Sequence, residues 1–325
     1  MLNPILFVYR MIRLTFYEFL SNFFGFRRIA KSKRQLPGKV VVITGANTGI
    51  GKETAFQMTL RKAKVYIGCR DVKKAETAVA QIKALNPGAD IHVLRLDLSS
   101  LKSVRMFAKE LSSLESTIDI LINNAGVMAC PEWQTEDGFE MQFGTNHLGH
   151  FLLTMHLLPL IKRSSNARIV NVSSCGHQLG DINLNNIMLR NGAYSPMIAY
   201  GQSKLANVLF TRELARRLTS TNVNNVNVYS LNPGAIQTDL ARHSDMSKGS
   251  VGKFIQRYFF MKPCMGSQTT LYCSLDEQLD NESGFYYNNC RRVTSMVSTA
   301  TDDHTARKLW DLSVDLVGLE KHLEI

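Results

Sequence analysis

The sequence predicts an α/β fold: a Rossmann-type, doubly wound parallel sheet of about seven strands with helices on both faces. Three observations indicate it. Short β-branched apolar runs alternate with amphipathic helical segments as far as about residue 290. A glycine-rich turn joins the first strand to its helix. No linker rich in Pro, Ser or Gly divides the chain of 325 residues, so we expect one large domain over residues 37–325.

The first strand and its turn, KVVVITGANTGIG, are suited to binding a phosphate. Residues 40–43 form a buried strand, and an amphipathic helix begins near Gly49. Gly45, Gly49 and Gly51 have a G-x3-G-x-G spacing that serves a tight turn, close approach of a cofactor and helix–strand packing. Free backbone N–H groups at the helix N-terminus then face the phosphate. An ordinary strand-to-helix turn is the alternative.

The second strand, residues 65–68, bears on which dinucleotide is bound. It ends in Cys69-Arg70-Asp71. An acidic residue at this strand end holds the ribose hydroxyls of NAD, whereas an arginine accommodates the 2′-phosphate of NADP. Asp71 directly precedes the helical residues 72–85 and is better explained as their N-cap. Arg70 then faces the phosphate, and the sequence favours NADP(H) over NAD(H).

The remaining elements follow in the same alternation. We expect strands at residues 91–96, 118–122, 168–172, 226–231 and near 285–287, and helices at 101–114, 138–162, 199–219 and 268–275. Asp97 follows the third strand and is a candidate either for the adenine amino group or for a helix cap. Asn123-Asn124-Ala125-Gly126 follows the fourth strand. Its small residues allow close approach of a cofactor, and its asparagines can tie strand ends together.

A second set of polar residues points to proton transfer. Ser174 follows the fifth strand, at the sheet edge where open α/β sheets place ligands. Tyr200 and Lys204 are neighbours on one helix face. A nearby ammonium stabilises a phenolate, so we expect a lowered pKa for Tyr200 and proton exchange with an alcohol or carbonyl. Asn146 lies inside a predicted helix, where asparagine is mildly unfavourable, which suggests a specific role.

Neither a metal site nor a disulfide framework is expected. His147 and His150 lie close together in the predicted helix 138–162, but no third ligand with suitable spacing is nearby. The six cysteines show no C-x-x-C and no regular spacing, so we expect reduced thiols in a chain that faces the cytosol.

Residues 1–36 form a segment of different character. Large apolar side chains fill residues 2–26, interrupted by Arg10, Arg13 and Glu18, in an amphipathic pattern. A span of about 20 uninterrupted apolar residues is missing, so we expect a helix lying in a membrane interface. A tilted span and a helix packed on the protein itself are alternatives. Residues 1–36 carry +6 of the chain's net charge of +11, which favours anionic lipid over nucleic acid as partner.

The order of these motifs resembles the short-chain dehydrogenase/reductase family. TGxxxGxG, NNAG, the helix asparagine, Ser174, YxxxK and PG come in the family's order over residues 38–290. The text TGANTGIGKETA, CRD, NNAGVM, TNHLGHFLLT, NVSS and SKLANVLFTREL is similar to the membrane-bound, NADP-preferring retinol dehydrogenases. One departure is the 25 residues between Ser174 and Tyr200, longer than in many members but in keeping with that subgroup.

The resemblance implies roles for single residues. Tyr200 is the acid/base, Lys204 binds the nicotinamide ribose and lowers the tyrosine pKa, Ser174 rather than Ser173 positions the substrate oxygen, and Asn146 holds a water of the proton relay. The implied cofactor-binding residues are Gly45, Asn47, Thr48, Gly49, Ile50, Gly51, Arg70, Asp97, Leu98, Asn124, Ala125, Gly126, Tyr200, Lys204, Pro233, Gly234 and Thr238.

The implied activity is NADP(H)-dependent hydride transfer between nicotinamide and a lipophilic alcohol or carbonyl, most directly retinol and retinal. Reduction of other hydrophobic carbonyls, such as lipid aldehydes or sterols, and an idle membrane-tethered scaffold are the alternatives. An apolar stretch over residues 254–261 fits a substrate drawn from lipid. The implied location is the endoplasmic reticulum membrane with the catalytic domain facing the cytosol; a mitochondrial membrane or lipid droplet is the alternative. A homo-oligomer is compatible with the family.

Overall fold

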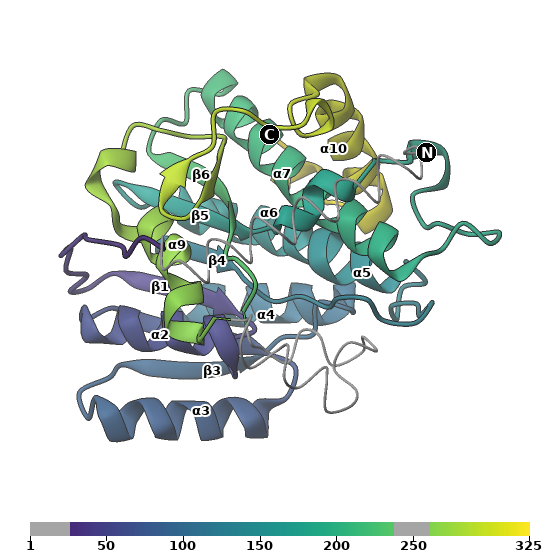
Figure 1. The fold of residues 1–325 in the computed structure, drawn as a ribbon. Coiled ribbons are helices and arrows are strands. Elements are labelled where there is room, and N and C mark those ends of the chain that lie inside the picture. The colour runs from purple at the N-terminus through teal and green to yellow at the C-terminus, as the bar shows by residue number, and fades with distance from the viewer. Residues whose placement is uncertain (1–26, 237–260) are drawn as a thin grey trace.

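A mostly parallel β-sheet forms the middle of the computed structural model, which describes residues 27–236 and 261–325. The strand order is β3-β2-β1-β4-β5-β6-β7-β8 (Figure 1). The strands are β1 (Val40–Thr44), β2 (Lys64–Cys69), β3 (Ile91–Arg95), β4 (Ile120–Asn123), β5 (Ala167–Val172), β6 (Val226–Asn232), β7 (Phe285–Asn288) and β8 (Arg291–Arg292). The strands from β1 to β7 pair in parallel, whereas β8 is antiparallel to β7. The predicted parallel sheet is confirmed, and a short antiparallel strand extends it.

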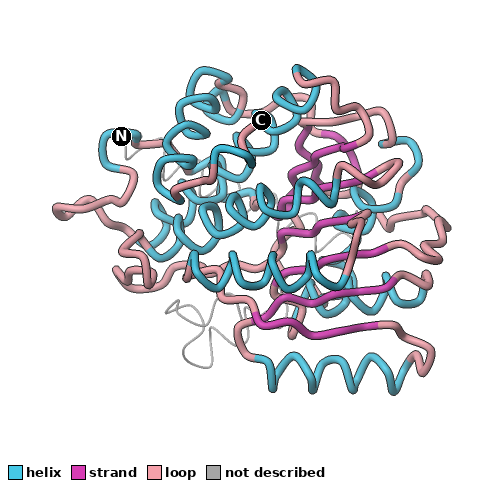
Figure 2. Tube along the Cα trace, turned by 180° about the vertical axis from the view of Figure 1, so that it is seen from behind, coloured by secondary structure: helices cyan, strands magenta, loops and turns pink. Residues whose placement is uncertain are grey.

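Strand residues alternate between two hydrophobic cores, one on each face of the sheet. Val40 and Val42 of β1 belong to one core, and Val41 and Ile43 belong to the other, as the two-residue period of a strand requires. The first core includes residues of α4 (Leu101–Leu114), α6 (Gly149–Ile161), α7 (Pro196–Ser220) and α10 (Asp303–Val317). The second includes residues of α2 (Gly49–Leu60), α3 (Val72–Leu85) and α9 (Pro263–Leu275). Helices therefore cover both faces, as the front and back views show (Figures 1 and 2).

The predicted helix over residues 138–162 begins later and is not uniform. It consists of a short α5 (Met141–Phe143), a π-helical stretch η1 (Gly144–Leu148) and α6. The N–H of Gly149 donates to the carbonyl of Gly144, five residues earlier, which is the π-type bond. Such π-turns often occur at functional sites, and this one contains Asn146.

The last helix expected from the sequence, at residues 268–275, is not the last one in the structure, because α10 follows the strands. Asp302 caps the N-terminus of this helix, and Gly318 ends it in the left-handed conformation with φ of 56°. Its buried residues, Ala306, Leu309, Trp310, Ser313 and Val317, recur at helical spacing. Both end signals and the apolar stripe are present in the sequence.

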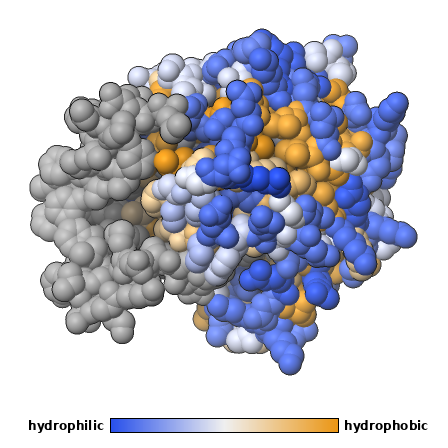
Figure 3. All heavy atoms as spheres, turned by 90° about the vertical axis from the view of Figure 1, so that its right-hand side faces the viewer, coloured by the Kyte–Doolittle hydropathy of each residue, from blue (hydrophilic) through white to orange (hydrophobic). Residues whose placement is uncertain are grey.

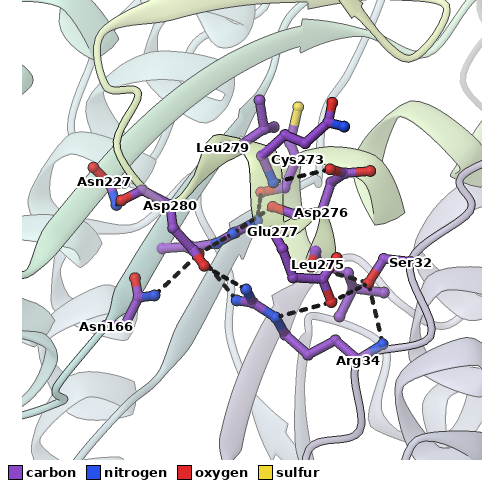
Figure 4. Close-up of polar contacts among 12 residues, drawn as sticks. Ser32, Arg34, Asn166, Asn227, Cys273, Leu275, Asp276, Glu277, Leu279 and Asp280 are labelled. Carbon is purple, nitrogen blue, oxygen red and sulfur yellow. Dashed lines mark hydrogen bonds and ion pairs between the residues drawn. The ribbon is translucent and has the colours of Figure 1, made fainter.

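Residues 27–36, called the N-terminal strap below, lie against α9 and the segment that follows it. Arg34 forms a two-pronged ion pair with Asp280, with N–O distances of 3.1 and 2.5 Å (Figure 4). Asp280 also contacts the guanidinium of the buried Arg168 and accepts from Asn166. The hydroxyl of Ser32 donates to the carbonyl of Leu275 at the end of α9. The boundary predicted at residue 36 stays a prediction, but the strap is bound to the sheet and to α9.

Several predictions lie outside the described residues: the amphipathic helix over 2–26, Thr238, and all but the last residue of the apolar stretch 254–261. Among the residues that are described, no helix is both long and apolar enough to cross a bilayer. The space-filling view shows hydrophobic residues between hydrophilic ones on one side of the molecule (Figure 3). The large apolar side chains exposed in the described chain are Ile29, Leu60, Leu85, Met106, Leu114, Trp133 and Ile198.

Candidate active site

A cavity of about 610 Å³ opens at the carboxyl ends of the parallel strands. Between β1 and β4 the strand order changes direction, and such switch points are where open α/β sheets bind ligands. The cavity is lined by Gly45, Asn47, Thr48, Gly49, Ile50, Gly51, Arg70, Asp97, Leu98, Asn124, Ala125, Gly126, Ser174, Tyr200, Lys204, Pro233 and Gly234, all predicted from the sequence. Asn146 is fully buried beside it, and Thr238 lies outside the described residues.

Each glycine of the glycine-rich turn is required for a separate structural reason. Gly45 and Gly49 have φ of +66° and +57°, a backbone conformation that favours glycine. A Cβ on Gly45 would lie 2.8 Å from the Cβ of Ala125, and one on Gly51 would lie 2.5 Å from the Asn124 amide nitrogen. The turn is therefore packed directly against the end of β4. It opens the N-terminus of α2 toward the cavity, where the first-turn N–H groups have no intrahelical partner.

The end of β2 carries positive charge into the cavity. Asp71 accepts from the N–H of Lys74 at 2.9 Å and caps α3, as predicted. The Arg70 side chain is mostly exposed, and its Nε lies 4.0 Å from Asp97. Lys74 also lines the cavity, and the sequence analysis missed it. The sequence could have indicated Lys74, because it lies in the first turn of α3, four residues after Arg70.

Asp97 is not the cap of α4. Its carboxylate accepts from the N–H and the hydroxyl of Ser99, at 3.0 and 2.6 Å, and so closes a tight turn after β3. Ser100 is the N-cap instead, accepting from the N–H of Ser103. The carboxylate therefore lines the cavity, and the adenine role stays a prediction.

Asparagine and threonine side chains join the strand ends, as predicted. The amide of Asn124 donates to the carbonyl of Thr44 at 2.8 Å, tying β4 to β1. The amide of Asn123 donates to Asn171 on β5 at 2.8 Å. The Thr44 hydroxyl accepts two backbone N–H groups and lies 2.8 Å from His150 Nε2. These bonds fix the floor of the cavity.

The two helix histidines have structural partners. His150 Nδ1 lies 3.0 Å from the carbonyl of Asn146, so this nitrogen is the donor and Nε2 is left to accept from Thr44. His147 contacts the hydroxyl of Ser313 on α10. Burial lowers the pKa of His150 to about 4 and that of His147 to about 3, so both are neutral near pH 7. Within the described chain no three His, Cys, Asp or Glu side chains are grouped to hold a metal, and the six cysteines are free.

Asn146, Lys204 and Gly126 meet beneath the cavity. A Cβ on Gly126 would lie 3.2 Å from Asn146 Oδ1 and 3.5 Å from Lys204 Nζ, so only glycine leaves this space open. Asn146 is held at both ends, because Oδ1 accepts from the N–H of Val127 and Nδ2 donates to its carbonyl. Lys204 Nζ donates to the carbonyl of Val172 at 3.1 Å.

The expected lowering of the Tyr200 pKa is contradicted. Lys204 Nζ lies 5.7 Å from the centre of the Tyr200 ring, yet burial raises the pKa of the phenol. The nearby Ser174 hydroxyl opposes this rise only in part. Burial also lowers the pKa of Lys204 to about 8. Removal from water therefore outweighs the hydrogen bond with Ser174, and Tyr200 is protonated at neutral pH.

The two serines at the end of β5 differ in what they do. Ser173 is buried, and its hydroxyl donates to the carbonyl of Lys204 at 2.7 Å. Ser174 is half-buried, and its Oγ accepts from the N–H of Gly176 at 3.1 Å. The Ser173 proton is thus committed to the backbone, whereas the Ser174 hydroxyl donates to Cys175 Sγ at 3.9 Å, a weak acceptor that a substrate oxygen can replace.

Part of the cavity lining was missed by the sequence analysis. This part comprises mainly apolar residues: Val127, Cys130, Trp133, Met141, Thr145 and Ile236. Except for Ile236 they come from the irregular segment after β4 and from α5 and η1, where no fixed spacing identifies them. Trp133, an exposed indole, also lines the cavity. Apolar walls with a few converging polar groups are typical of small-molecule sites.

Comparison with known proteins agrees with this geometry. A family model described as short chain dehydrogenase matches residues 39–248. The chain is 48% identical over 291 residues to retinol dehydrogenase 11 from Homo sapiens, covering 90% of this chain and 89% of that protein. It is 48% identical over 294 residues to retinol dehydrogenase 12 from Homo sapiens, covering 90% of each. A crystal structure of an uncharacterised protein from Mycobacterium paratuberculosis is 37% identical, with a TM-score of 0.74, covering 90% of this chain and 98% of that one. This chain belongs to the short-chain dehydrogenase family, whose members are oxidoreductases that act on alcohol or carbonyl groups with a nicotinamide cofactor.

Proposed function

We propose that this protein interconverts retinol and retinal, or a closely similar lipophilic alcohol and carbonyl, with NADP(H). The observation that carries the proposal is the position of Ser174, Tyr200 and Lys204 in one cavity that apolar residues such as Val127, Met141 and Ile236 also line. The relatives named retinol dehydrogenase, 48% identical over nearly the whole chain, support the retinoid as substrate.

The donor set fits a dinucleotide. The α2 N-terminus and the glycine turn suit a pyrophosphate, and Arg70 and Lys74 suit a 2′-phosphate. Lys204 is the residue we assign to the nicotinamide ribose. When bound, the nicotinamide supplies or accepts the hydride.

Tyr200 is the proposed acid for carbonyl reduction. Because burial raises its pKa, the phenol holds its proton at neutral pH and can donate it to the substrate oxygen. Ser174 donates a hydrogen bond to the same oxygen. Asn146, held by Val127 and by the hydroxyl of Ser203 at 2.9 Å, fixes the backbone beside Lys204. Its predicted water-holding role is part of this proposal.

We also propose a membrane surface as partner, through residues 1–36, which join the apolar segment 2–26 to a charge of +6. The endoplasmic reticulum membrane, with the catalytic domain facing the cytosol, is the proposed location. A retinoid dissolves in lipid, so an enzyme at the bilayer surface meets its substrate there.

A substrate comparison tests the proposal. Retinal, decanal and a ketosteroid are each supplied with NADPH or NADH, and initial rates are measured for the full chain. We expect retinal with NADPH to give the highest kcat/KM. Faster reduction of decanal or the ketosteroid would favour the lipid-carbonyl alternative. Tight NADPH binding without turnover of any of the three would favour the scaffold.

A further inference from the structure

His177 lies directly behind Ser174 and is buried to 1% exposure. It belongs to a 3-10 turn, η2 (Cys175–Leu179), whose N-cap is Ser174. His177 Nδ1 lies 2.7 Å from the carbonyl oxygen of Ser174, and its backbone N–H donates to the same oxygen at 3.2 Å. A carbonyl can only accept, so Nδ1 carries the ring proton. Burial lowers the pKa of His177 to about 4, which keeps the ring neutral.

The rest of the turn is packed on the catalytic tyrosine. A Cβ on Gly176 would lie 3.1 Å from Tyr200 Cε1, so the backbone of the turn contacts the phenol ring. On the other side, the His177 ring meets Tyr286 of β7 edge-on, with ring centres 4.7 Å apart. The turn therefore sits between Tyr200 and β7, and His177 connects it to the backbone of Ser174.

The hydrogen bonds of Ser174 explain why this connection matters. The N–H of Gly176 occupies one lone pair of Ser174 Oγ at 3.1 Å, and the hydroxyl donates to Cys175 Sγ at 3.9 Å, a weak acceptor that a substrate oxygen can replace. The direction of that proton depends on the turn that holds Gly176. With its carbonyl bound twice by His177, Ser174 keeps an extended backbone, with φ of −165° and ψ of 161°.

From this geometry we propose that His177 is a positioning residue: its Nδ1–H holds the Ser174 carbonyl so that the Ser174 hydroxyl is aimed at the substrate oxygen beside Tyr200. The inference rests on the proposed function, because Ser174 acts there on a carbonyl substrate. Nothing in the sequence pattern separates this histidine from a core residue.

Two substitutions separate the hydrogen bond from the packing. His177→Phe keeps a ring against Tyr286 but removes the donor. His177→Asn keeps an N–H close to the position of Nδ1 but removes the ring. We measure kcat and KM for retinal, NADPH affinity by fluorescence, and amide hydrogen exchange over residues 173–180. His156→Phe is the matched control, because His156 lies on α6 and contacts Glu320 instead.

We expect His177→Phe to lower kcat by about 10- to 100-fold, the usual cost of small misplacement in a site, with NADPH affinity unchanged. Exchange over residues 173–180 should rise in this variant. His177→Asn should keep most of kcat and protection, and His156→Phe should keep both. If His177→Phe does not fold, His177→Gln, whose N–H lies near Nε2 rather than Nδ1, replaces it.

Wild-type kcat in the Phe variant, or lost kcat in the Asn variant with full activity in the Phe variant, would overturn the inference. If the wild-type protein itself reduces no retinal, the proposed function fails. The exchange comparison of the Phe and Asn variants still tests His177 in that case.

Discussion

Arg70 and Lys74 carry the proposed preference for NADP(H) at the scale of single residues. Both line the cavity at the β2 end. A charge-assisted contact with a phosphate is worth about 1.5–3 kcal/mol, or about 10- to 100-fold in affinity. Arg70→Ala should therefore weaken NADPH binding by about that factor and leave NADH binding nearly unchanged, measured by fluorescence titration. Lys73→Ala, an exposed neighbour that does not line the cavity, is the control. Equal losses for both cofactors would contradict the preference.

Tyr200 and Lys204 show where reasoning from single residues stops. Their spacing of four residues on one helix predicts their contact correctly, because helix geometry is local. The sign of the Tyr200 pKa shift was wrong, because burial depends on the packing of β5, η2 and α7, which the pair's own spacing does not contain. The motifs predicted that the two residues lie together, but they did not predict whether each is protonated.

At the scale of elements, Asp280 links three parts of the chain. It lies in the segment after α9 and contacts Arg168 of β5 and Arg34 of the strap (Figure 4). Arg168 is 1% exposed, so removing Asp280 leaves a buried charge that keeps the carbonyls of Cys273 and Asp276 but loses its carboxylate, a loss that typically costs about 3–5 kcal/mol. Asp280→Ala should lower the free energy of unfolding by about that amount in urea titration. Asp303→Ala breaks the more exposed pair with Arg212 and should cost about 1 kcal/mol or less. A similar loss of unfolding free energy in both variants would contradict this role of Asp280.

The strap allows the predicted membrane attachment to be tested separately from the stability of the fold. Deleting residues 1–26 removes the apolar segment but keeps Arg34 and Ser32 in place, so the protein should leave the membrane pellet and stay folded. Deleting residues 1–36 should also release it but lower its melting temperature. High salt alone should not release the full chain, because apolar insertion is not screened. A 1–26 deletion that still pellets with membranes would place the anchor elsewhere.

The sequence predicted the parallel strands well because each is a β-branched run followed by a turn and a helix. It predicted less well what depends on distant packing. The π-stretch holds Asn146 against the backbone of Val127, in the segment after β4, a long-range contact that local propensity does not contain. The apolar part of the cavity comes from an irregular segment without periodicity. By contrast, the sequence of α10 contains an N-cap residue, an apolar stripe and a terminal glycine. These signals are local, yet the sequence analysis missed this helix.

At the scale of the whole molecule, three buried histidines make stability depend on pH. His147, His150 and His177 have pKa values lowered by burial to about 3, 4 and 4, from an ordinary value near 6.5. Below pH 6.5 the unfolded chain therefore binds protons that the folded chain rejects. We therefore expect the histidines' contribution to the free energy of unfolding to be complete above pH 6.5 and to fall progressively from pH 6.5 to 5. Urea titration at each pH measures it.

His147→Phe tests one share of that pH dependence. The ring lies among Phe143, Phe151 and Phe210, so phenylalanine suits the site without a titrating group. The variant should lose less stability between pH 7 and 5 than the wild-type protein. Identical pH slopes would contradict the assignment of this histidine.

The central claim is that Tyr200 donates the proton in carbonyl reduction. The most direct measurement is single-turnover reduction of retinal by Tyr200→Phe, with NADPH binding followed by fluorescence. Phenylalanine keeps the ring and its packing on Gly176 but removes the only proposed acid. We predict a rate loss of about 10²- to 10⁴-fold, the usual cost of losing a positioned acid, with cofactor binding intact. A near-normal single-turnover rate would contradict the account.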